Sequence, residues 1–499
     1  MAWDPEFEVA FKPKAVAVVG ASRESAGWGD FVSALQRAQF PGSIYPINPR
    51  AAGEKIRGLT AYPNLVSVPE HIDLVMVSVP ADAVPAVLED CIAADARNIH
   101  IFTAGFRETG EEKGIRLERE IKEIAKRGGL RILGPNCMGL HVPAGRITTW
   151  DQFSPESGPV AFISQSGGHA GQFVGDGARF GLKFSKVISI GNTTVMDSID
   201  FLEYLANDPE TGIICMYLEG VSDGNKLTSM VRQINLTKPV VIWKGGLTQW
   251  GSKAVASHTG ALGGEREVWD AFYRQTGAVR VDGLEELLDV TMTLQCLAPL
   301  PSSHIALMGG GGGNSVAGAD VCTRAGLDLP TLADGTQAKL RTFIPPDGTI
   351  IRNPLDIGVV LRDVNLLLQA LEPVAADPTI DSIIFALPLG LLVGGSAAGS
   401  LAAQGQQMTQ EALRGEVEKQ FQVVMDCLIK FDRENEQHKP IIIVLQPGLG
   451  PFIPGMRGRA QEMLLEEGIP VYFSLERAAR AVGKVYQYHD FLRRVGREG

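Results

Sequence analysis

The cysteine content of the chain excludes two common classes of small stabilised domain. Six cysteines, at positions 91, 137, 215, 296, 322 and 427, are spread along 499 residues, and no two of them form a Cys-x-x-Cys pair. This spacing suits neither a disulfide framework nor a structural zinc site. We expect these side chains to be buried as small hydrophobic groups.

Long apolar runs and excess positive charge are also missing. The longest apolar stretch, around Ile383 to Val393, is too short to cross a bilayer, and the first eight residues lack the basic and apolar regions of a signal peptide. Lysine and arginine total 46 against 57 aspartate and glutamate residues, a net charge of −11. That balance argues against a nucleic acid or an anionic membrane as the main partner. These absences predict a cytoplasmic protein.

A strand–loop–helix pattern occurs three times. An apolar, β-rich segment runs into a glycine/serine loop and then into a helical pattern at 15–22, 159–168 and 304–314. Continuous apolar runs bounded by turn residues are typical of strands buried on both faces of a parallel sheet. We therefore predict an α/β protein with three consecutive parallel-sheet domains of the Rossmann or flavodoxin type, with ligands at the carboxyl ends of the strands.

Two proline- and serine-rich segments, 143–159 and 297–303, are the predicted linkers. Within the last domain, the low-complexity stretch 394–400 predicts a loop, and a helix is expected from about 407 to 431.

His258 lies at the centre of a segment, 251–264, that is rich in glycine, alanine and serine. Such a composition predicts a mobile loop, not a packed helix or strand. Imidazole is a nucleophile and a leaving group near neutral pH, so a histidine on a moving loop can carry a phosphoryl group. The alternative is a surface loop whose histidine has no role.

Two glycine loops are candidate phosphate sites. Ser164-Gln165-Ser166-Gly167-Gly168 places two hydroxyls and several backbone amides at a predicted helix start. Gly311, Gly312 and Gly313 belong to a run of five glycines, which favours close approach of the backbone to a ligand or partner. The alternative for the first loop is a serine N-cap with glycines for tight packing. For His169, which follows it, packing is the better prediction.

The loop after the first predicted strand of the chain, Gly20-Ala21-Ser22-Arg23, does not match the Gly-x-Gly-x-x-Gly motif of dinucleotide-binding domains. The second predicted strand ends in Asn48 and Arg50, with a cation where nicotinamide enzymes usually carry a carboxylate. A ligand with extra phosphates is therefore favoured over NAD, and a plain structural turn remains the alternative.

Glu219 follows another apolar strand, where a carboxylate can face a site. A carboxylate bonded to one imidazole nitrogen leaves the other nitrogen free to attack. The alternative is an ordinary acid in solvent at a strand end.

Together these segments resemble the NDP-forming acyl-CoA synthetases, relatives of succinyl-CoA synthetase, over nearly the whole chain. The resemblance implies a CoA-binding domain over 8–145, a phosphohistidine domain over 158–298 and a third ligase-like domain over 302–492. It assigns His258 as the phosphorylated residue, Glu219 as its partner and the serine/glycine loops as phosphate sites. The residues that it implies for CoA binding are Gly20, Ala21, Ser22, Arg23, Asn48, Arg50, Val79, Pro80, Asn136 and Cys137.

The implied reaction joins a small carboxylic acid to CoA with hydrolysis of ATP to ADP and phosphate. CoA is then a substrate, and no tightly bound prosthetic group or metal site is expected on this chain. No ATP-grasp domain is recognisable in the sequence, so the resemblance implies a separate ATP-grasp β subunit that binds ATP or ADP with Mg²⁺, and a hetero-oligomer. Two departures stand out: His169 replaces a small or aliphatic residue, and the segment 394–437 is longer than the family needs.

Two other functions remain as alternatives. A non-catalytic CoA-binding regulatory protein would keep the scaffold, but the intact histidine segment and both serines argue against it. A nicotinamide-dependent dehydrogenase is disfavoured by Arg50 and by the two further phosphate loops.

Overall fold

The computed structural model describes residues 5–23, 29–150, 155–259, 264–358, 363–403, 409–446 and 453–498. The chain divides into two compact units. The first consists of residues 1–178 and 182–287, and the second of residues 179–181 and 288–499.

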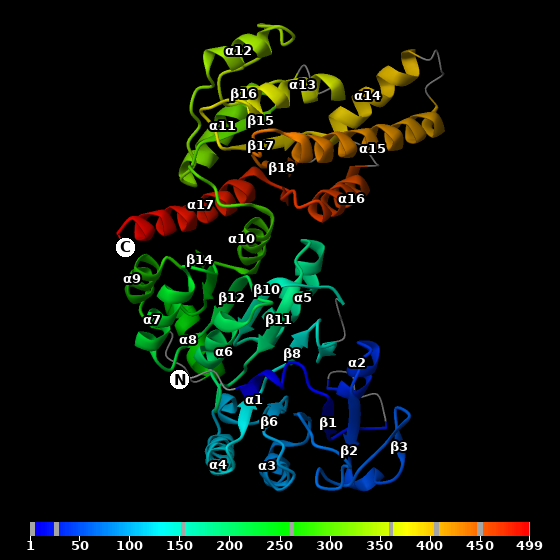
Figure 1. Ribbon diagram of the computed structural model, residues 1–499, viewed down its shortest axis with the longest axis vertical. Coiled ribbons are helices and arrows are strands. Elements are labelled where there is room, and N and C mark those ends of the chain that lie inside the picture. Colours follow the sequence, from blue (N-terminus) through cyan, green and yellow to red (C-terminus); the bar gives the residue numbers. More distant parts are fainter. Residues whose placement is uncertain are drawn as a thin grey trace. The chain divides into compact units, whose positions relative to one another are not determined.

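The first unit contains two sheets with helices around them (Figure 1). The first sheet is wholly parallel, with the order β2-β1-β5-β6-β7. Its strands are β1 (Ala15–Val19), β2 (Ser43–Ile47), β5 (Leu74–Val77), β6 (Asn98–Ile101) and β7 (Arg131–Leu133). Its helices are α2 (Phe31–Arg37), α3 (Val84–Ala93) and α4 (Glu112–Gly128), with a small hairpin of β3 (Lys55–Ile56) and β4 (Leu59–Thr60) and 3-10 turns η1 (Pro49–Ala51), η2 (Ala81–Ala83) and η3 (Arg107–Thr109).

The second sheet has the order β14-β13-β12-β10-β11-β8-β9. Five strands are parallel: β10 (Ser157–Ser164), β11 (Phe184–Ser189), β12 (Ile213–Leu218), β13 (Val240–Lys244) and β14 (Val279–Val281). The edge strands β8 (Gly139–Val142) and β9 (Ile147–Thr148) are antiparallel. Its helices are α5 (Gly167–Arg179), α6 (Ser198–Asn207), α7 (Gly224–Ile234), α8 (Gln249–Thr259) and α9 (Arg266–Thr276), followed by α10 (Leu284–Cys296), which continues into the second unit from residue 288.

One hydrophobic cluster joins the two sheets of the first unit. Phe7 of α1 (Pro5–Glu8) and the nearby Phe11 pack on α6, where the rings of Phe11 and Tyr204 stack at 4.5 Å. Beside them the buried Lys186 pairs with Asp208 at 2.7 Å. Because buried aromatic rings contribute strongly to stability, this interface joins the two sheets into one compact unit.

The second unit holds a third parallel sheet, with the order β16-β15-β17-β18-β19. Its strands are β15 (Ile305–Gly309), β16 (Leu355–Asp356), β17 (Ser382–Leu387), β18 (Ile441–Leu445) and β19 (Val471–Tyr472). Its helices are α11 (Gly312–Arg324), α12 (Asp334–Arg341), α13 (Val364–Ala375), α14 (Leu389–Ala403), α15 (Gln410–Glu434), α16 (Ile453–Glu466) and α17 (Leu475–Glu498).

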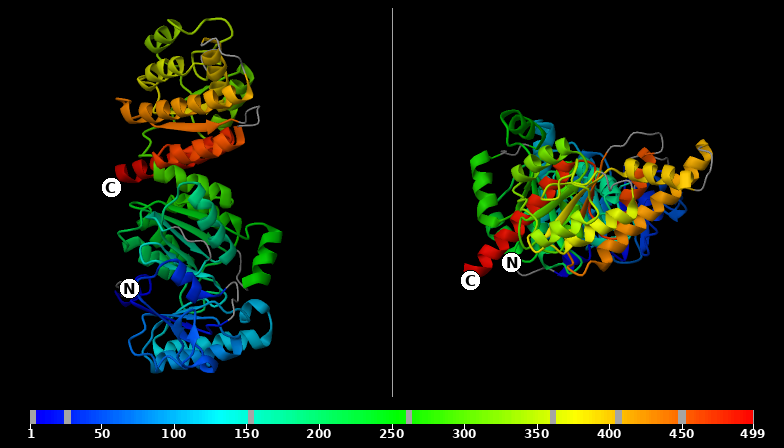
Figure 2. Two further views of the ribbon diagram at one scale, coloured as in Figure 1. Left: turned by 90° about the vertical axis from the view of Figure 1, so that its right-hand side faces the viewer. Right: turned by 90° about the horizontal axis from the view of Figure 1, so that it is seen from above.

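The predicted fold class is confirmed: the chain is an α/β protein built on several parallel sheets. The prediction of a loop at 394–400 is wrong, because these residues lie inside α14. That helix lies beside α15 (Figure 2), and it buries Leu392, Ala397 and Leu401. Apolar burial against a neighbouring helix therefore overrides the low helix propensity of glycine and serine. In the described part of the chain, no helix has the length and apolar character needed to cross a bilayer.

Candidate functional site

The candidate site lies at the carboxyl edge of the second sheet. The neighbouring strands β10, β12 and β13 end at Ser164, Leu218 and Lys244. The loops that follow them therefore meet at one edge, which is where ligands bind in parallel sheets. The buried apolar runs of these strands produce this arrangement, because they fix the register that brings their polar ends together.

The serines of the first phosphate loop are engaged with their own backbone. The Ser166 amide donates to Ser164 Oγ at 3.1 Å, and Ser164 Oγ donates to the Ser166 carbonyl at 2.7 Å. Ser166 Oγ accepts from the amide of His169 at 3.3 Å, which caps the start of α5. The N-cap alternative therefore describes the hydroxyl of Ser166, whereas that of Ser164 bonds within the loop. Gly168 is exposed, and a Cβ there would meet nothing closer than 3.8 Å, so the helix start is open to a ligand.

Gln165 and Lys244 hold the peptide that carries Glu219. Gln165 Oε1 accepts from the Glu219 amide and from the Gly220 amide, the latter at 3.0 Å. From the other side, Lys244 Nζ donates to the Glu219 carbonyl at 3.0 Å and to the Gly245 carbonyl. The Glu219 carboxylate accepts from the Tyr217 hydroxyl at 3.1 Å. Glu219, which is 6% exposed, is thus fixed by side chains from three neighbouring strands or strand ends.

Lys244 was not found by sequence reasoning. Burial lowers the pKa of its ammonium group to about 8, although the nearby charge of Glu219 acts in the opposite direction. The group also lies 5.3 Å from the centre of the Trp269 ring. The available signal was a lysine at the end of the apolar run Val240–Trp243, where a buried cation needs a partner.

His258 lies in the last turn of α8, and residues 260–263 are outside the described residues. The prediction that 251–264 is a loop throughout is therefore wrong for 251–259. Thr248 starts the helix, since its hydroxyl accepts from the Gly251 amide at 3.0 Å. Alanine, glutamine and lysine then favour the helix, and Val255 is buried against Gly246. Helix α8 follows β13, the neighbour of the strand that ends before Glu219.

His169 packs in an aromatic cluster at the same edge. Its ring centre lies 4.7 Å from that of Tyr217 and 4.5 Å from that of Trp243. The packing role predicted for this residue is what its ring contacts show.

The residues predicted to bind CoA gather at the carboxyl edge of the first sheet. Asn48 Nδ2 donates to the Ala21 carbonyl at 2.8 Å, and its Oδ1 accepts from the Arg50 amide at 2.9 Å. Gly20 has a φ of +91°, and a Cβ there would lie 2.2 Å from the Ser78 carbonyl oxygen, so close packing alone requires glycine. Arg23 pairs with Glu54 at the surface.

The loops after β5, β6 and β7 are linked to one another. The hydroxyl of Thr103 donates to the Val79 carbonyl at 2.6 Å, and the amide of Asn136 donates to the Thr103 carbonyl at 2.9 Å. Pro80 follows Val79 directly, so it lies at the same edge. The thiol of Cys137 is buried and faces the Ile101 carbonyl, and burial raises its pKa. Any contact of Cys137 with a ligand must therefore use its backbone.

In the second unit, the five-glycine run is closed by a carboxylate. Asp356 Oδ1 accepts from the Gly311 amide at 2.7 Å and from the Gly358 amide at 3.3 Å. A cavity of about 160 Å³ lies beside it, lined in part by Gly310 and Asn314. A Cβ on Gly313 would meet nothing within 4 Å, so this glycine remains open.

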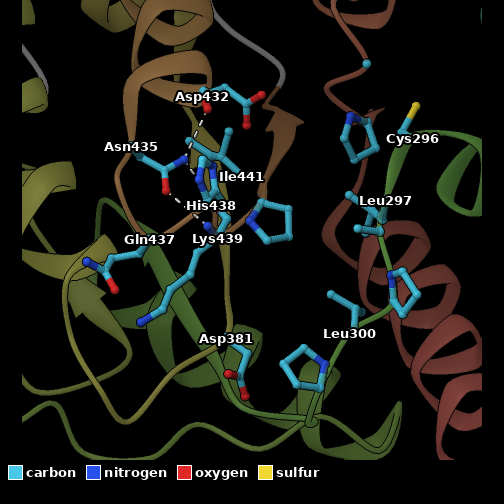
Figure 3. A pocket seen from close by; sticks show the side chains of 16 residues that line it. Cys296, Leu297, Leu300, Asp381, Asp432, Asn435, Gln437, His438, Lys439 and Ile441 are labelled. Atoms are coloured by element: carbon cyan, nitrogen blue, oxygen red, sulfur yellow. Dashed lines mark hydrogen bonds between the residues drawn. The ribbon is translucent and has the colours of Figure 1, made fainter.

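A cavity of about 380 Å³ lies at the opposite, amino edge of the third sheet (Figure 3). Asn435 Oδ1 accepts from the Lys439 amide at 3.0 Å, and its Nδ2 donates to the Asp432 carbonyl at 3.2 Å. Lys439 Nζ donates to the Asp377 carbonyl. These polar groups satisfy one another, as in a structural cavity, and they lie away from the edge where ligands of parallel sheets bind.

Comparison with known proteins agrees with this architecture. Residues 14–143 match a CoA binding domain, and residues 157–294 match a succinyl-CoA ligase like flavodoxin domain. The α subunit of the ADP-forming acetate–CoA ligase II of Pyrococcus furiosus is 32% identical over 96% of both chains. The ADP-forming acetate–CoA ligase I of Archaeoglobus fulgidus is 37% identical over 76% of this chain, which spans about half (54%) of that longer protein.

A solved structure extends the likeness to the whole chain. The dinucleotide-forming acetyl-coenzyme A synthetase 1 of Ca. Korarchaeum cryptofilum, in complex with phosphate and ADP, covers 98% of both chains with a TM-score of 0.82 at 27% identity. The chain therefore belongs to the family of the ADP-forming acetate–CoA ligase α subunits, the NDP-forming acyl-CoA synthetases.

Proposed function

We propose that this chain is the α subunit of an acid–thiol ligase that converts a small carboxylic acid, CoA and ATP into acyl-CoA, ADP and phosphate. The observation that carries the proposal is the carboxyl edge of the second sheet. There an open helix start, a buried carboxylate fixed by neighbouring strands and a histidine-bearing helix belong to adjacent strand–helix units. A site in which a histidine exchanges phosphoryl groups needs backbone amides that bind the phosphate and a carboxylate that orients the imidazole.

The reaction divides into three transfers. In the first, a nitrogen of His258 bonds to the γ-phosphorus of ATP, and the bond to ADP breaks. In the second, a carboxylate oxygen of the acid takes the phosphoryl group from the histidine and forms an acyl phosphate. In the third, the sulfur of CoA attacks the acyl carbonyl carbon, the C–S bond forms, and phosphate leaves. Division of one condensation into these steps keeps each barrier moderate.

The residues of the second sheet have distinct roles in this proposal. Glu219 orients the imidazole of His258 and stabilises its charged form. Gln165 and Lys244 hold Glu219 in place, and the ammonium of Lys244 adds positive charge near the moving phosphate. The amino end of α5, from Ser166 to Gly168, receives the phosphate through backbone amides.

The loops of the first sheet hold CoA in this proposal. Gly20–Arg23, Asn48, Arg50, Val79, Pro80 and the backbone of Asn136 and Cys137 all lie at its carboxyl edge. Met138, which follows Cys137, packs on Gly167, where a Cβ would lie 2.6 Å from its side chain. We call the loops after β1, β2, β5 and β7 the CoA loops and α5 the phosphate helix. The CoA loop after β7 and the phosphate helix are therefore direct neighbours, which the third transfer requires.

Nucleotide binding belongs to a partner in this proposal. A separate ATP-grasp β subunit would hold ATP or ADP with Mg²⁺, and the two subunits would form a hetero-oligomer. The segment that carries His258 would reach the nucleotide on that subunit and return to the acid. The Gly311–Gly313 run is proposed as a second anion contact, with only part of its helix start open beside Asp356.

The decisive experiment uses the complex with the ATP-grasp subunit and ATP labelled at the γ-phosphate. We expect an acid-labile label on His258 in the absence of acid and CoA, and release of that label when both are added. A complex that makes thioester without any modified histidine would exclude the relay. A chain that binds CoA but accepts no label in any complex would instead be a regulatory protein.

A further inference from the structure

Two domains, defined by the matched ranges, meet at Asn192: the first, residues 14–143, holds the first sheet, and the second, residues 157–294, holds β10 to β14. Asn192, in the loop after β11 of the second domain, binds the first domain through each of its polar atoms. Its Nδ2 donates to Glu108 Oε2 at 2.6 Å and to Glu118 Oε2 at 3.0 Å, and its Oδ1 accepts from Asn136 Nδ2 at 3.3 Å. Its backbone amide donates to the Pro135 carbonyl at 3.0 Å, and its carbonyl accepts from the Arg107 guanidinium. The residue is 1% exposed, so these bonds are shielded from water.

The partners of Asn192 shape two loops at the predicted CoA edge. Glu108 Oε1 accepts from the Gly105 amide at 2.6 Å and from the Phe106 amide at 3.1 Å, which fixes the turn that follows β6. Glu118 pairs with Arg107 at 3.2 Å. Burial acts to raise the pKa of Glu108, but hydrogen bonds from Asn192, Gly105 and Phe106 outweigh it and keep that pKa below its usual value. The amide group of Asn192 thus lies between two carboxylates.

The backbone next to Asn192 makes equally close contact with the loop after β7. Gly191 has a φ of +54°, and a Cβ there would lie 2.3 Å from the Pro135 carbonyl oxygen and 2.6 Å from that of Asn136. On its other side the same loop contacts the start of α5 through Met138. The loop from 134 to 138 is therefore held between the Asn192 loop and the phosphate helix.

The same network reaches the histidine-bearing helix. The short segment η3, which contains Arg107 and Glu108, packs against α8. One residue of the second domain thus fixes two loops of the first domain, one of which contacts the phosphate helix and the other the helix of His258.

We infer that Asn192 is a positioning residue for thioester formation: it holds the CoA loops against the second domain so that the thiol of bound CoA meets the acyl phosphate. The inference rests on the proposed function. In this step the C–S bond forms, the C–O bond to phosphate breaks, phosphate leaves with the electron pair, and the thiol proton passes to solvent. A misplacement of about 1 Å between reacting groups is enough to slow such a step roughly 100-fold.

The test compares two partial reactions in the complex with the ATP-grasp subunit. For Asn192→Ala we expect kcat of acyl-CoA formation at saturating CoA to fall about 100-fold. Labelling of His258 by ATP should change less than about twofold, because the Arg107–Glu118 pair and the bonds of Glu108 to Gly105 and Phe106 still fix η3, the segment that contacts α8. Asn192→Ser retains a short hydroxyl donor, adds no charge beside Glu108 and Glu118, and cannot reach both carboxylates, so it should show the same split if the alanine variant folds poorly. Melting curves establish that each variant is folded.

The matched control is Lys12→Ala. This change removes a surface ion pair to Glu210, which links the segment just before the first domain to the second domain at the opposite edge of the second sheet. It should leave both partial reactions unchanged. Equal loss of labelling and thioester formation in the Asn192 variants, unaltered thioester formation, or failure of both variants to fold would overturn the inference. A wild-type complex that forms neither phosphohistidine nor thioester would instead overturn the proposed function.

Discussion

Two glycine loops of the molecule share the same sequence pattern, but their backbone amides have different hydrogen-bond acceptors. In the second sheet, the loop after β10 caps its own helix with Ser166, and the nearest strand-end acid, Glu219, is turned to Tyr217. In the third sheet, Asp356 on the adjacent strand takes up the Gly311 amide directly. An acid at the end of a neighbouring strand can thus either leave a glycine loop open or close part of it.

The lesson is that a strand–glycine–helix unit does not by itself define an anion site. The same backbone amides bind an external phosphate only where no carboxylate of the chain already occupies them. The loop of the second sheet meets this condition at Gly168, whereas the loop of the third sheet meets it only beyond Gly311.

The strongest test of this contrast is removal of the imidazole. His258→Ala should lower acyl-CoA formation by a factor of about 1,000 or more, because the proposed relay passes through the nitrogen nucleophile of this side chain. Binding of CoA, followed by calorimetry, should remain near the wild-type value. Full turnover in this variant would show that the reaction does not pass through a phosphohistidine at the second sheet.

A smaller loss is expected when the acid of the second sheet becomes an amide. Glu219→Gln keeps the shape of the side chain but removes the charge that orients an imidazole, so labelling of His258 should fall about 10- to 100-fold. The melting temperature should change little, since the backbone contacts of Gln165 and Lys244 remain. Unchanged labelling would show that Glu219 serves only Tyr217.

The equivalent change in the third sheet should affect stability more than chemistry. Asp356→Ala removes the acceptor of two backbone amides in a buried position, which should cost about 2 kcal/mol of unfolding free energy. Asp356→Asn retains an acceptor oxygen and should lose less. Calorimetry measures the difference, and a loss of His258 labelling as large as in Glu219→Gln would show that the two loops act alike.

The smallest effect concerns the pH dependence of stability at Lys244. Burial lowers the pKa of its ammonium group to about 8 in the folded chain, from an ordinary pKa of 10.5. Between these values the unfolded chain binds more protons, so wild-type stability should rise with pH relative to Lys244→Met. Melting temperatures from pH 7 to 10 should show a relative gain of about one to two degrees. The exposed Lys419→Met is the control, and parallel curves for all three proteins would contradict the assignment.

Sequence patterns were sufficient for the sheets because buried parallel strands have a distinctive composition. The runs at 15–19, 160–164 and 305–309 are central strands, and the predicted helix near 407–431 corresponds to α15. The errors at 251–259 and 394–400 share one cause. Alanine- and glycine-rich segments form helices when a neighbouring surface buries one face, and that surface is not visible in the local sequence.

The contacts that support the site could not be predicted from the sequence for a related reason. Lys244 meets Glu219 across 25 positions, and Asn192 meets Glu108 across 84. Such pairs depend on which strand lies beside which, and a single sequence does not provide that order. The roles of His258, of the phosphate loops and of the CoA loops stay predictions that the experiments above address.

The edge strands β8 and β9 have a practical consequence for dissecting the molecule. They follow directly on the loop Gly134–Cys137, yet they complete the second sheet through β11. A fragment that stops soon after residue 145 would keep β8 without its sheet. The rest of the chain would then carry β11 with an unpaired edge, which favours aggregation. Exchange of CoA modules between relatives should therefore place its junctions before β8, so that the recipient keeps its own edge.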